Sequence, residues 1–190
     1  IWPGEVSADP DGEHLIFNGV KVSSFAEKDP TKLPWKDLGV DVVLECTGFF
    51  TEKEAAMAHI QAGAKRVIIS APPKGSMSTH IISVNEGDIK SDDPIISNAS
   101  CTTNCITPVV SVINREFGIL KAMMTTIHSY TADQNLQDGP HKDLRRARAA
   151  AENIVPTTTG AAVSTTEVIP ELKGLFDGLA IRVPTPVGSL

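Results

Sequence analysis

The sequence predicts an α/β chain in two parts, divided at about Ser100. The first part alternates strand and helix patterns, which favours a parallel sheet. The second part begins with a long amphipathic helix pattern and continues with longer strand patterns, which favours a separate α+β unit. The chain has 190 residues, 41% of them hydrophobic, and this is enough apolar material for a substantial core.

The first element that we expect is a β-hairpin. Leu15–Phe17 and Val20–Val22 are short β-type runs separated by Asn18 and Gly19. Asn-Gly is the preferred pair in type I′ turns, because both residues tolerate positive φ angles. The next run, Gly39–Leu44, is short and apolar and is typical of a buried parallel strand.

A helix is expected after that strand. Thr51 and Glu54 have the spacing of a capping box, and Gly63 is placed to end the helix. The apolar run Arg66–Ser70 predicts a second buried strand. Strand, helix and strand within about thirty residues make a βαβ unit, and Ile95–Ile96 is expected to add a third parallel strand.

The second part begins with a helix that has one apolar face. The residues on this face are Ile106, Val109, Val110, Ile113 and Phe117. Pro108 is compatible with this helix only in or near its first turns, because proline has no backbone N–H to donate. Beyond it we expect strands at Leu120–His128 and Leu179–Pro184, separated by a charged helix around Leu144–Ile154.

Composition excludes several classes of protein. A net charge of -6 argues against a general nucleic-acid binder. No apolar run approaches the ~20 residues of a membrane span, so no membrane partner is expected. Three cysteines without framework spacing indicate a reducing compartment, and we expect a cytoplasmic protein. Cys101 and Cys105 are spaced i, i+4, but no second Cys or His pair is spaced for zinc, so no metal is expected.

Cys101 lies where a strand pattern gives way to a helix pattern, inside Ser100-Cys101-Thr102-Thr103-Asn104. A thiol at a helix N-terminus meets unpaired N–H groups and the positive end of the helix dipole. Both favour the thiolate, which is the nucleophilic form. The alternative is a buried structural cysteine beside a well-capped helix, and the residues themselves leave both interpretations open.

The ends of the first two strands carry residues suited to a ligand. Thr47, Gly48 and Phe49 follow the first strand, and Ser70 and Ala71 follow the second. In doubly wound sheets, ligands bind at the carboxyl ends of the strands. Phe49 is suited to packing on a flat ring. An ordinary strand-to-helix turn is the alternative, and no G-x-G-x-x-G fingerprint occurs in the sequence.

His128 follows the β-type run Thr125–Ile127 and is the expected partner of Cys101. A histidine at a strand end can deprotonate a thiol that the fold brings within hydrogen-bond reach. The remaining histidines are expected to be surface or core residues without an obvious partner. They are His14, His59, His80 and His141.

Three features are compatible with anion binding. For the basic cluster Lys142–Arg148 the leading explanation is a solvated helix face, and the alternatives are an anion site or a subunit contact. Thr157–Gly160 offers hydroxyls and backbone N–H groups to a phosphate. Arg182 is able to add a charge-assisted hydrogen bond.

Taken together, these segments resemble the glyceraldehyde-3-phosphate dehydrogenase family. The signature Ser-Asn-Ala-Ser-Cys-Thr-Thr-Asn-Cys at 97–105 is highly specific to that family. The other matching segments are Phe25–Pro30, Glu45–Phe49, Ile69–Lys74, His128–Gln134, His141–Gly160 and Ile181–Pro186. The resemblance implies part of a Rossmann-type dinucleotide-binding domain at 1–100, without its first βαβ unit. Part of an α+β catalytic domain with a mostly antiparallel sheet is expected at 101–190.

The resemblance also implies roles for single residues. Cys101 resembles the nucleophile that forms a thiohemiacetal and then a thioester, and His128 resembles its base. Thr131 and Arg182 match the residues that hold the substrate's C3 phosphate. The attacking phosphate would be held by Ser100, Thr102, Thr159 and Gly160. The stretches that line the dinucleotide are matched by Thr47, Gly48, Phe49, Ser70 and Ala71.

The implied reaction converts glyceraldehyde 3-phosphate, phosphate and NAD to 1,3-bisphosphoglycerate and NADH in glycolysis. Pro140 resembles the NAD-specific members, so NAD is expected rather than NADP. The loop that carries Pro140 implies a homotetramer. Two alternatives stay open: an erythrose-4-phosphate dehydrogenase, and a non-catalytic fragment in which Cys101 and Cys105 are only sensitive to oxidation.

Overall fold

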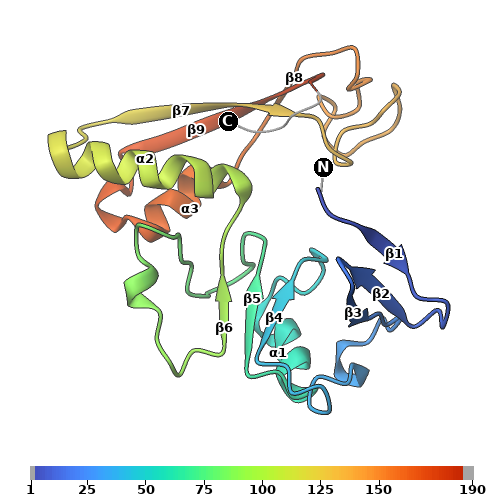
Figure 1. Ribbon diagram of the computed structural model, residues 1–190. Coiled ribbons are helices and arrows are strands. Elements are labelled where there is room, and N and C mark those ends of the chain that lie inside the picture. The colour runs from blue at the N-terminus through green and yellow to red at the C-terminus, as the bar shows by residue number, and fades with distance from the viewer. Residues whose placement is uncertain (1–2, 186–190) are drawn as a thin grey trace.

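The computed structural model describes residues 3–185, and three small sheets organise this part of the chain (Figure 1). The strands are β1 (Val6–Ala8), β2 (His14–Phe17), β3 (Val20–Ser23), β4 (Val42–Glu45), β5 (Arg66–Ile69), β6 (Ile95–Ser97), β7 (Ala122–Ser129), β8 (Val155–Thr157) and β9 (Phe176–Val183). The α-helices are α1 (Lys53–Gln61), α2 (Cys101–Phe117) and α3 (Ala161–Val168). Short 3-10 turns are η1 (Pro30–Lys32), η2 (Glu86–Asp88) and η3 (Pro170–Leu172).

The N-terminal hairpin is confirmed. β2 and β3 are antiparallel, with Phe17 opposite Val20. Asn18 and Gly19 both have positive φ, 48° and 80°, as a type I′ turn requires. β1 adds a third strand beside β2. The sequence did not indicate β1, because its three residues are all exposed and show no apolar alternation.

The βαβ unit is also confirmed. β4, β5 and β6 lie side by side in that order, and both pairs are parallel. Val43, Val67 and Ile95 are buried together with Ala56 of α1, and Figure 1 shows α1 against one face of this sheet. Parallel strands place their carboxyl ends at one edge, so the segments after β4, β5 and β6 come together there.

The capping box predicted at Thr51 is wrong. Helix α1 begins at Lys53 with Glu52 as its N-cap, and Glu52 makes no side-chain capping bond. The Thr51 hydroxyl is buried and has no hydrogen-bond partner among residues 3–185. The reason lies in the backbone, because Lys74 donates its N–H to the Thr51 carbonyl at 3.0 Å and pairs with Glu52 in a bridge. This pairing holds residues 51 and 52 extended.

Gly63, which follows the C-cap of α1, offers a test of this packing. Its φ is 111°, and a Cβ added there would lie 2.5 Å from Lys36 Cβ and 2.7 Å from Lys36 Cα. We expect Gly63→Ala to lower the free energy of unfolding by about 2–4 kcal/mol, because it adds backbone strain to a collision with main chain. Urea denaturation measures this. Gly87→Ala, which meets nothing within 4 Å and has ordinary φ, is the control and should change stability little.

The sheet in the second part of the chain, β7-β9-β8, is called the second sheet from here on, and it corrects the expectation of a mostly antiparallel arrangement. Its order is β7-β9-β8, and the long pair β7 and β9 is parallel, from Ala122 opposite Phe176 to Ser129 opposite Val183. Only the short strand β8 is antiparallel to β9. The connection from β7 to β9 contains β8 and α3, which gives it the length that a parallel return requires.

The charged helix expected around Leu144–Ile154 is wrong as well, because this segment forms a series of turns. Its backbone N–H groups bond outside a helical pattern. Ala149 N donates to Asp138 Oδ1 at 2.8 Å and Arg145 N donates to Asp143 Oδ1 at 3.0 Å. Aspartate side chains therefore compete successfully with helix formation here.

Helix α2 packs beneath the second sheet with a face that only partly matches the prediction (Figure 1). Val110 is buried, but Val109, Ile113 and Phe117 are exposed. The buried side chains are instead mostly threonines, and Thr107 Oγ1 lies 2.9 Å from Thr165 Oγ1 of α3. The helix also continues through Pro108, well beyond its first turn. The core between helices and sheet contains Val110, Met124, Ala161, Ala162 and Phe176.

Candidate active site

Cys101 is the first residue of α2 and its side chain is exposed. The N-cap is Ser100, whose hydroxyl oxygen accepts from Thr103 N at 3.1 Å. Ala99, immediately before the cap, has φ 56°, so the chain turns sharply between β6 and the helix. The thiol thus lies at a capped helix N-terminus, just past the carboxyl end of the parallel sheet, with the positive end of the helix dipole beside it.

The fold brings His128 to this thiol. His128 lies near the end of β7 and only 8% of it is exposed. The Cys101 Sγ to His128 Nε2 distance is 3.5 Å, which is within the reach of a hydrogen bond to sulfur. A base within this distance can take the thiol proton directly.

Arg182 of β9 lies beside His128 because the two residues are register partners in the parallel pair β7 and β9. Arg182 Nη1 lies 2.7 Å from His128 Nδ1 and 3.1 Å from the Ser129 carbonyl oxygen, and His128 Nδ1 lies 2.7 Å from that same oxygen. A guanidinium only donates and a carbonyl only accepts. Nδ1 therefore either accepts from Arg182 or donates to Ser129, and the second state leaves the Nε2 lone pair facing Cys101.

Arg182 has capacity for a further partner. Its Nε is buried without a hydrogen-bond partner among residues 3–185. Burial lowers the pKa of Arg182, while the charges of Cys101 and Asp133 act in the opposite direction. A buried guanidinium with an unused donor, next to an exposed thiol, is suited to an anionic substrate group.

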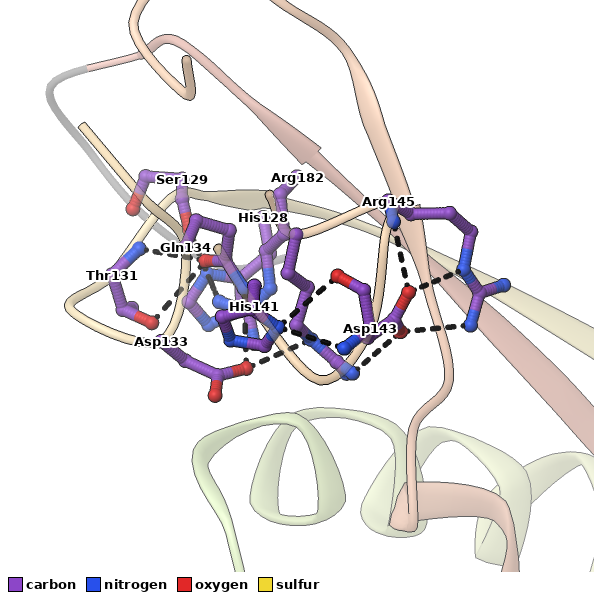
Figure 2. Close-up of polar contacts among 10 residues, drawn as sticks. His128, Ser129, Thr131, Asp133, Gln134, His141, Asp143, Arg145 and Arg182 are labelled. Carbon is purple, nitrogen blue, oxygen red and sulfur yellow. Dashed lines mark hydrogen bonds and ion pairs between the residues drawn. The ribbon is translucent and has the colours of Figure 1, made fainter. Parts of the chain in front are cut away.

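Thr131 follows β7, and a buried side chain that the sequence did not indicate holds its backbone. Gln134 is 3% exposed, and its Oε1 accepts from Thr131 N at 2.9 Å and lies 3.4 Å from Thr131 Oγ1 (Figure 2). Next to it in the chain, Asp133 forms an ion pair with Arg146, with 2.8 Å between Asp133 Oδ2 and Arg146 Nε. Gln134 and Asp133 lie inside a matching segment, but only the tertiary structure shows their contacts.

Asp143 anchors the neighbouring loop through Arg145 at 3.0 Å (Figure 2). It also lies 2.8 Å from Arg146. Hydrogen bonds from Arg145 lower the pKa of Asp143 from 3.8 to about 2.

A depressed folded-state pKa contributes stability that is present above pH 3.8 and is lost as the pH falls through about 2. We expect hydrogen exchange of residues 138–149 to accelerate in that window, and Asp143→Asn to accelerate it already at neutral pH. The variant should weaken this pH dependence without abolishing it, because hydrogen bonds from Ala149 and Arg148 also lower the pKa of Asp138.

The residues expected to hold the attacking phosphate lie at the N-termini of α2 and α3. Ser100 caps α2, and Thr102 is buried in its first turn. Gly160 is the N-cap of α3, and Thr159 Oγ1 accepts from Ala161 N at 3.1 Å. Helix N-termini offer unpaired N–H groups and positive potential to anions.

The residues expected at the dinucleotide lie at one edge of the parallel sheet. Thr47–Phe49 follow β4 and are exposed, with Phe49 83% exposed. Ser70 N donates to the Glu45 carbonyl at 3.0 Å, which joins the segments after β4 and β5. Gly48 has φ 75°, a conformation that brings backbone close to a ligand without a Cβ in the way. An exposed ring, a hydroxyl and open backbone at this edge fit a dinucleotide.

The four remaining histidines all have partners, contrary to expectation. His14 Nδ1 lies 2.8 Å from Asp11, His80 Nδ1 lies 3.2 Å from the Asn85 carbonyl and His141 Nδ1 lies 3.1 Å from the Asp143 carbonyl. His59 lies 2.9 Å from Glu45, and both side chains are buried. These contacts join residues far apart in sequence or depend on a local turn, so composition and spacing do not indicate them.

Between residues 3 and 185, no three His, Cys, Asp or Glu side chains are grouped so that they could hold a metal ion. No helix in that range has the length and apolar character to cross a membrane.

Two family models match this chain. The glyceraldehyde 3-phosphate dehydrogenase NAD binding domain matches residues 1–53, and the glyceraldehyde 3-phosphate dehydrogenase C-terminal domain matches residues 100–190. Pro186, at the end of one matching segment, lies outside the described residues.

Curated relatives agree with the family models. The chain is 58% identical to glyceraldehyde-3-phosphate dehydrogenase of Clostridium pasteurianum over 178 residues, 93% of this chain and 53% of the relative. It is 56% identical to the protein of that name from Mycolicibacterium smegmatis, over 99% of this chain and 55% of the relative. It is 53% identical to the glyceraldehyde-3-phosphate dehydrogenase of Zymomonas mobilis, over 100% of this chain and 56% of the relative. The chain therefore spans about half the length of the curated relatives that it matches.

Proposed function

Because this chain belongs to the glyceraldehyde-3-phosphate dehydrogenase family, we propose that it carries the catalytic centre of an NAD-dependent phosphorylating aldehyde dehydrogenase. The observation that carries this proposal is the 3.5 Å distance from Cys101 Sγ to His128 Nε2 at the edge of the parallel sheet. The expected overall reaction converts glyceraldehyde 3-phosphate, phosphate and NAD to 1,3-bisphosphoglycerate and NADH in glycolysis.

The reaction steps follow from the contact between Cys101 and His128. His128 Nε2 takes the proton of the Cys101 thiol, and the sulfur adds to the aldehyde carbon. The former carbonyl oxygen then receives that proton from His128, which gives the thiohemiacetal and returns His128 to its neutral form. His128 then removes the hydroxyl proton of that adduct as its hydride leaves, and a thioester on Cys101 results. NAD, when bound, supplies the hydride acceptor. Inorganic phosphate attacks the thioester carbon, and the Cys101 sulfur leaves as thiolate with release of the acyl phosphate.

Arg182 and Thr131 are proposed to hold the C3 phosphate of the substrate. The buried Nε of Arg182, which has no hydrogen-bond partner among residues 3–185, supports this role. An anion that draws Arg182 away from His128 Nδ1 leaves that nitrogen free to donate to the Ser129 carbonyl. Substrate binding would thereby favour the form of His128 that acts as a base. Ser100, Thr102, Thr159 and Gly160 would receive the attacking phosphate.

NAD is the proposed cofactor, and NADP is less favoured because of Pro140. Thr47, Gly48 and Phe49 would approach the dinucleotide from the end of β4, and Ser70 and Ala71 from the end of β5. The exposure of Phe49 and the positive φ of Gly48 support this fit.

The protein is further proposed to be a cytoplasmic homotetramer. One face of the second sheet supports an assembly, because it exposes Met123 (71%), Ile127 (47%) and Leu179 (40%) on adjacent strands. An apolar face of this kind is typical of surfaces that other subunits cover.

The test uses protein expressed from its complete coding sequence. NADH formation at 340 nm should require glyceraldehyde 3-phosphate and phosphate together, and one equivalent of iodoacetate should abolish it. Comparing kcat/KM for glyceraldehyde 3-phosphate and erythrose 4-phosphate separates the two aldehyde substrates. A protein that binds NAD but oxidises neither aldehyde would support the non-catalytic alternative and refute the enzyme.

A further inference from the structure

A chain of hydrogen bonds runs from the buried face of α1 to the exposed loop Thr47–Phe49. Trp35 Nε1 lies 3.1 Å from His59 Nδ1, and His59 Nε2 lies 2.9 Å from Glu45 Oε2. Glu45 Oε1 accepts from Thr47 N at 2.7 Å and from the Thr47 hydroxyl. Thr47 Oγ1 in turn accepts from Phe49 N at 3.2 Å.

Trp35 fixes the direction of these hydrogen bonds. An indole N–H is only a donor, so His59 Nδ1 must accept and carries no proton. The single ring proton of neutral His59 is then on Nε2 and is donated to Glu45. Glu45 is correspondingly ionised, since its hydrogen bonds from Thr47 and His59 outweigh burial and lower its pKa.

Packing leaves His59 little freedom to rotate. Its ring lies 6.3 Å from the Trp35 ring and 6.0 Å from the Phe50 ring, measured between centroids. Glu45 is 3% exposed and His59 is 5% exposed. A buried carboxylate destabilises the fold unless its oxygens accept hydrogen bonds. Losing the hydrogen bonds from Thr47 or His59 would therefore be unfavourable.

We propose that Trp35, His59 and Glu45 are positioning residues that hold the loop Thr47–Phe49 in its dinucleotide-binding conformation. This inference rests on the proposed function, because it takes that loop to be part of the NAD site. The loop itself is exposed, and Gly48 gives it a freely adjustable backbone. The buried carboxylate beneath the loop therefore determines its conformation. Because the loop is ordered before NAD binds, NAD binding does not have to supply the free energy of ordering it.

The tautomer is tested first, in the unmodified protein. Long-range 1H–15N spectra of protein with 15N-labelled histidine should show His59 protonated at Nε2 and unprotonated at Nδ1. Because the loop is ordered before NAD binds, addition of NAD should leave this tautomer unchanged. A proton on Nδ1 would overturn the proposed direction. A change of the His59 tautomer on NAD binding would overturn the inference alone, and no NAD binding by calorimetry would overturn the proposed function itself.

The energetic test is Glu45→Gln. The amide can still accept from Thr47 N, but its NH2 group then faces the Nε2–H of His59, and two donors repel. His59 cannot change tautomer, because Trp35 donates to its other nitrogen. We expect the KM and dissociation constant for NAD to rise about tenfold to a hundredfold, with kcat at saturating NAD changed little.

The double variant Trp35→Phe/Glu45→Gln separates this mechanism from general destabilisation. Without the indole donor, His59 can move its proton to Nδ1 and accept the Gln amide at Nε2. The double variant should therefore bind NAD more tightly than Glu45→Gln alone, whereas a merely structural role predicts weaker binding. Glu54→Gln, which changes an exposed carboxylate on α1, the helix that carries His59, is the control. Equal NAD affinity of wild type and Glu45→Gln would also refute the proposal.

Discussion

Replacing Cys101 with serine is expected to lower kcat by about 10⁴-fold or more. A serine hydroxyl remains largely protonated with His128 as its base, and a hemiacetal formed on it leads to an ester rather than a thioester. The substitution keeps the Ser100 cap and the first turn of α2, so the protein should fold normally. NADH formation under saturating substrate measures the loss, and circular dichroism verifies the fold.

Cys105→Ser is the matched control. Cys105 is half-buried on the same helix, one turn after Cys101. It should retain most of the activity and still bind one equivalent of iodoacetate. If Cys101→Ser kept near wild-type turnover, or if Cys105→Ser lost as much as Cys101→Ser, the proposed covalent mechanism would be refuted.

The second large effect is expected for His128→Gln, which should lower kcat by about 10²–10⁴-fold. The glutamine amide cannot take the thiol proton across the 3.5 Å gap, nor accept a proton during hydride transfer. The rate of alkylation of Cys101 by iodoacetamide at neutral pH should fall as well, because the thiol then ionises without a base. Stopped-flow alkylation and steady-state kinetics measure the two effects separately.

His14→Gln is the control for His128→Gln, since His14 lies in the hairpin and contacts Asp11. Its alkylation rate and kcat should match wild type. Unchanged alkylation in His128→Gln together with reduced kcat would restrict His128 to the hydride step, and unchanged kcat would remove it from the proposed mechanism.

The local parts of the fold could be predicted because they depend on neighbours in sequence. Asn18 and Gly19 form the expected turn, and the apolar runs before Glu45 and Ser70 form the expected parallel strands. Helix α2 begins at Cys101, where the strand pattern gives way to a helix pattern. Hairpin turns, caps and short buried strands are each specified by a few adjacent residues.

The predictions that failed depended on contacts that the residue pattern does not reveal, whether the partners lie far away in the chain or within the same loop. The capping box at Thr51 is displaced because Lys74 pairs with residues 51 and 52. The helix expected near Leu144 is absent because Asp138 and Asp143 bind its backbone N–H groups. On α2, Thr107 is buried against Thr165 while Phe117 is exposed, because α3 and not hydrophobicity decides which face is covered.

The sequence by itself determined the α/β type of the chain, the N-terminal hairpin, the βαβ unit and the place of Cys101 at the start of a helix, and a nine-residue signature around Cys101 indicated the chemistry. Only the tertiary structure decided which groups meet: Cys101 with His128, His128 with Arg182, and Glu45 with His59. The physical reason is that hydrogen bonds act over about 3 Å, whereas these partners are separated by 14 to 54 positions along the chain. The register of β7 and β9 and the packing of α1 bring them within that distance.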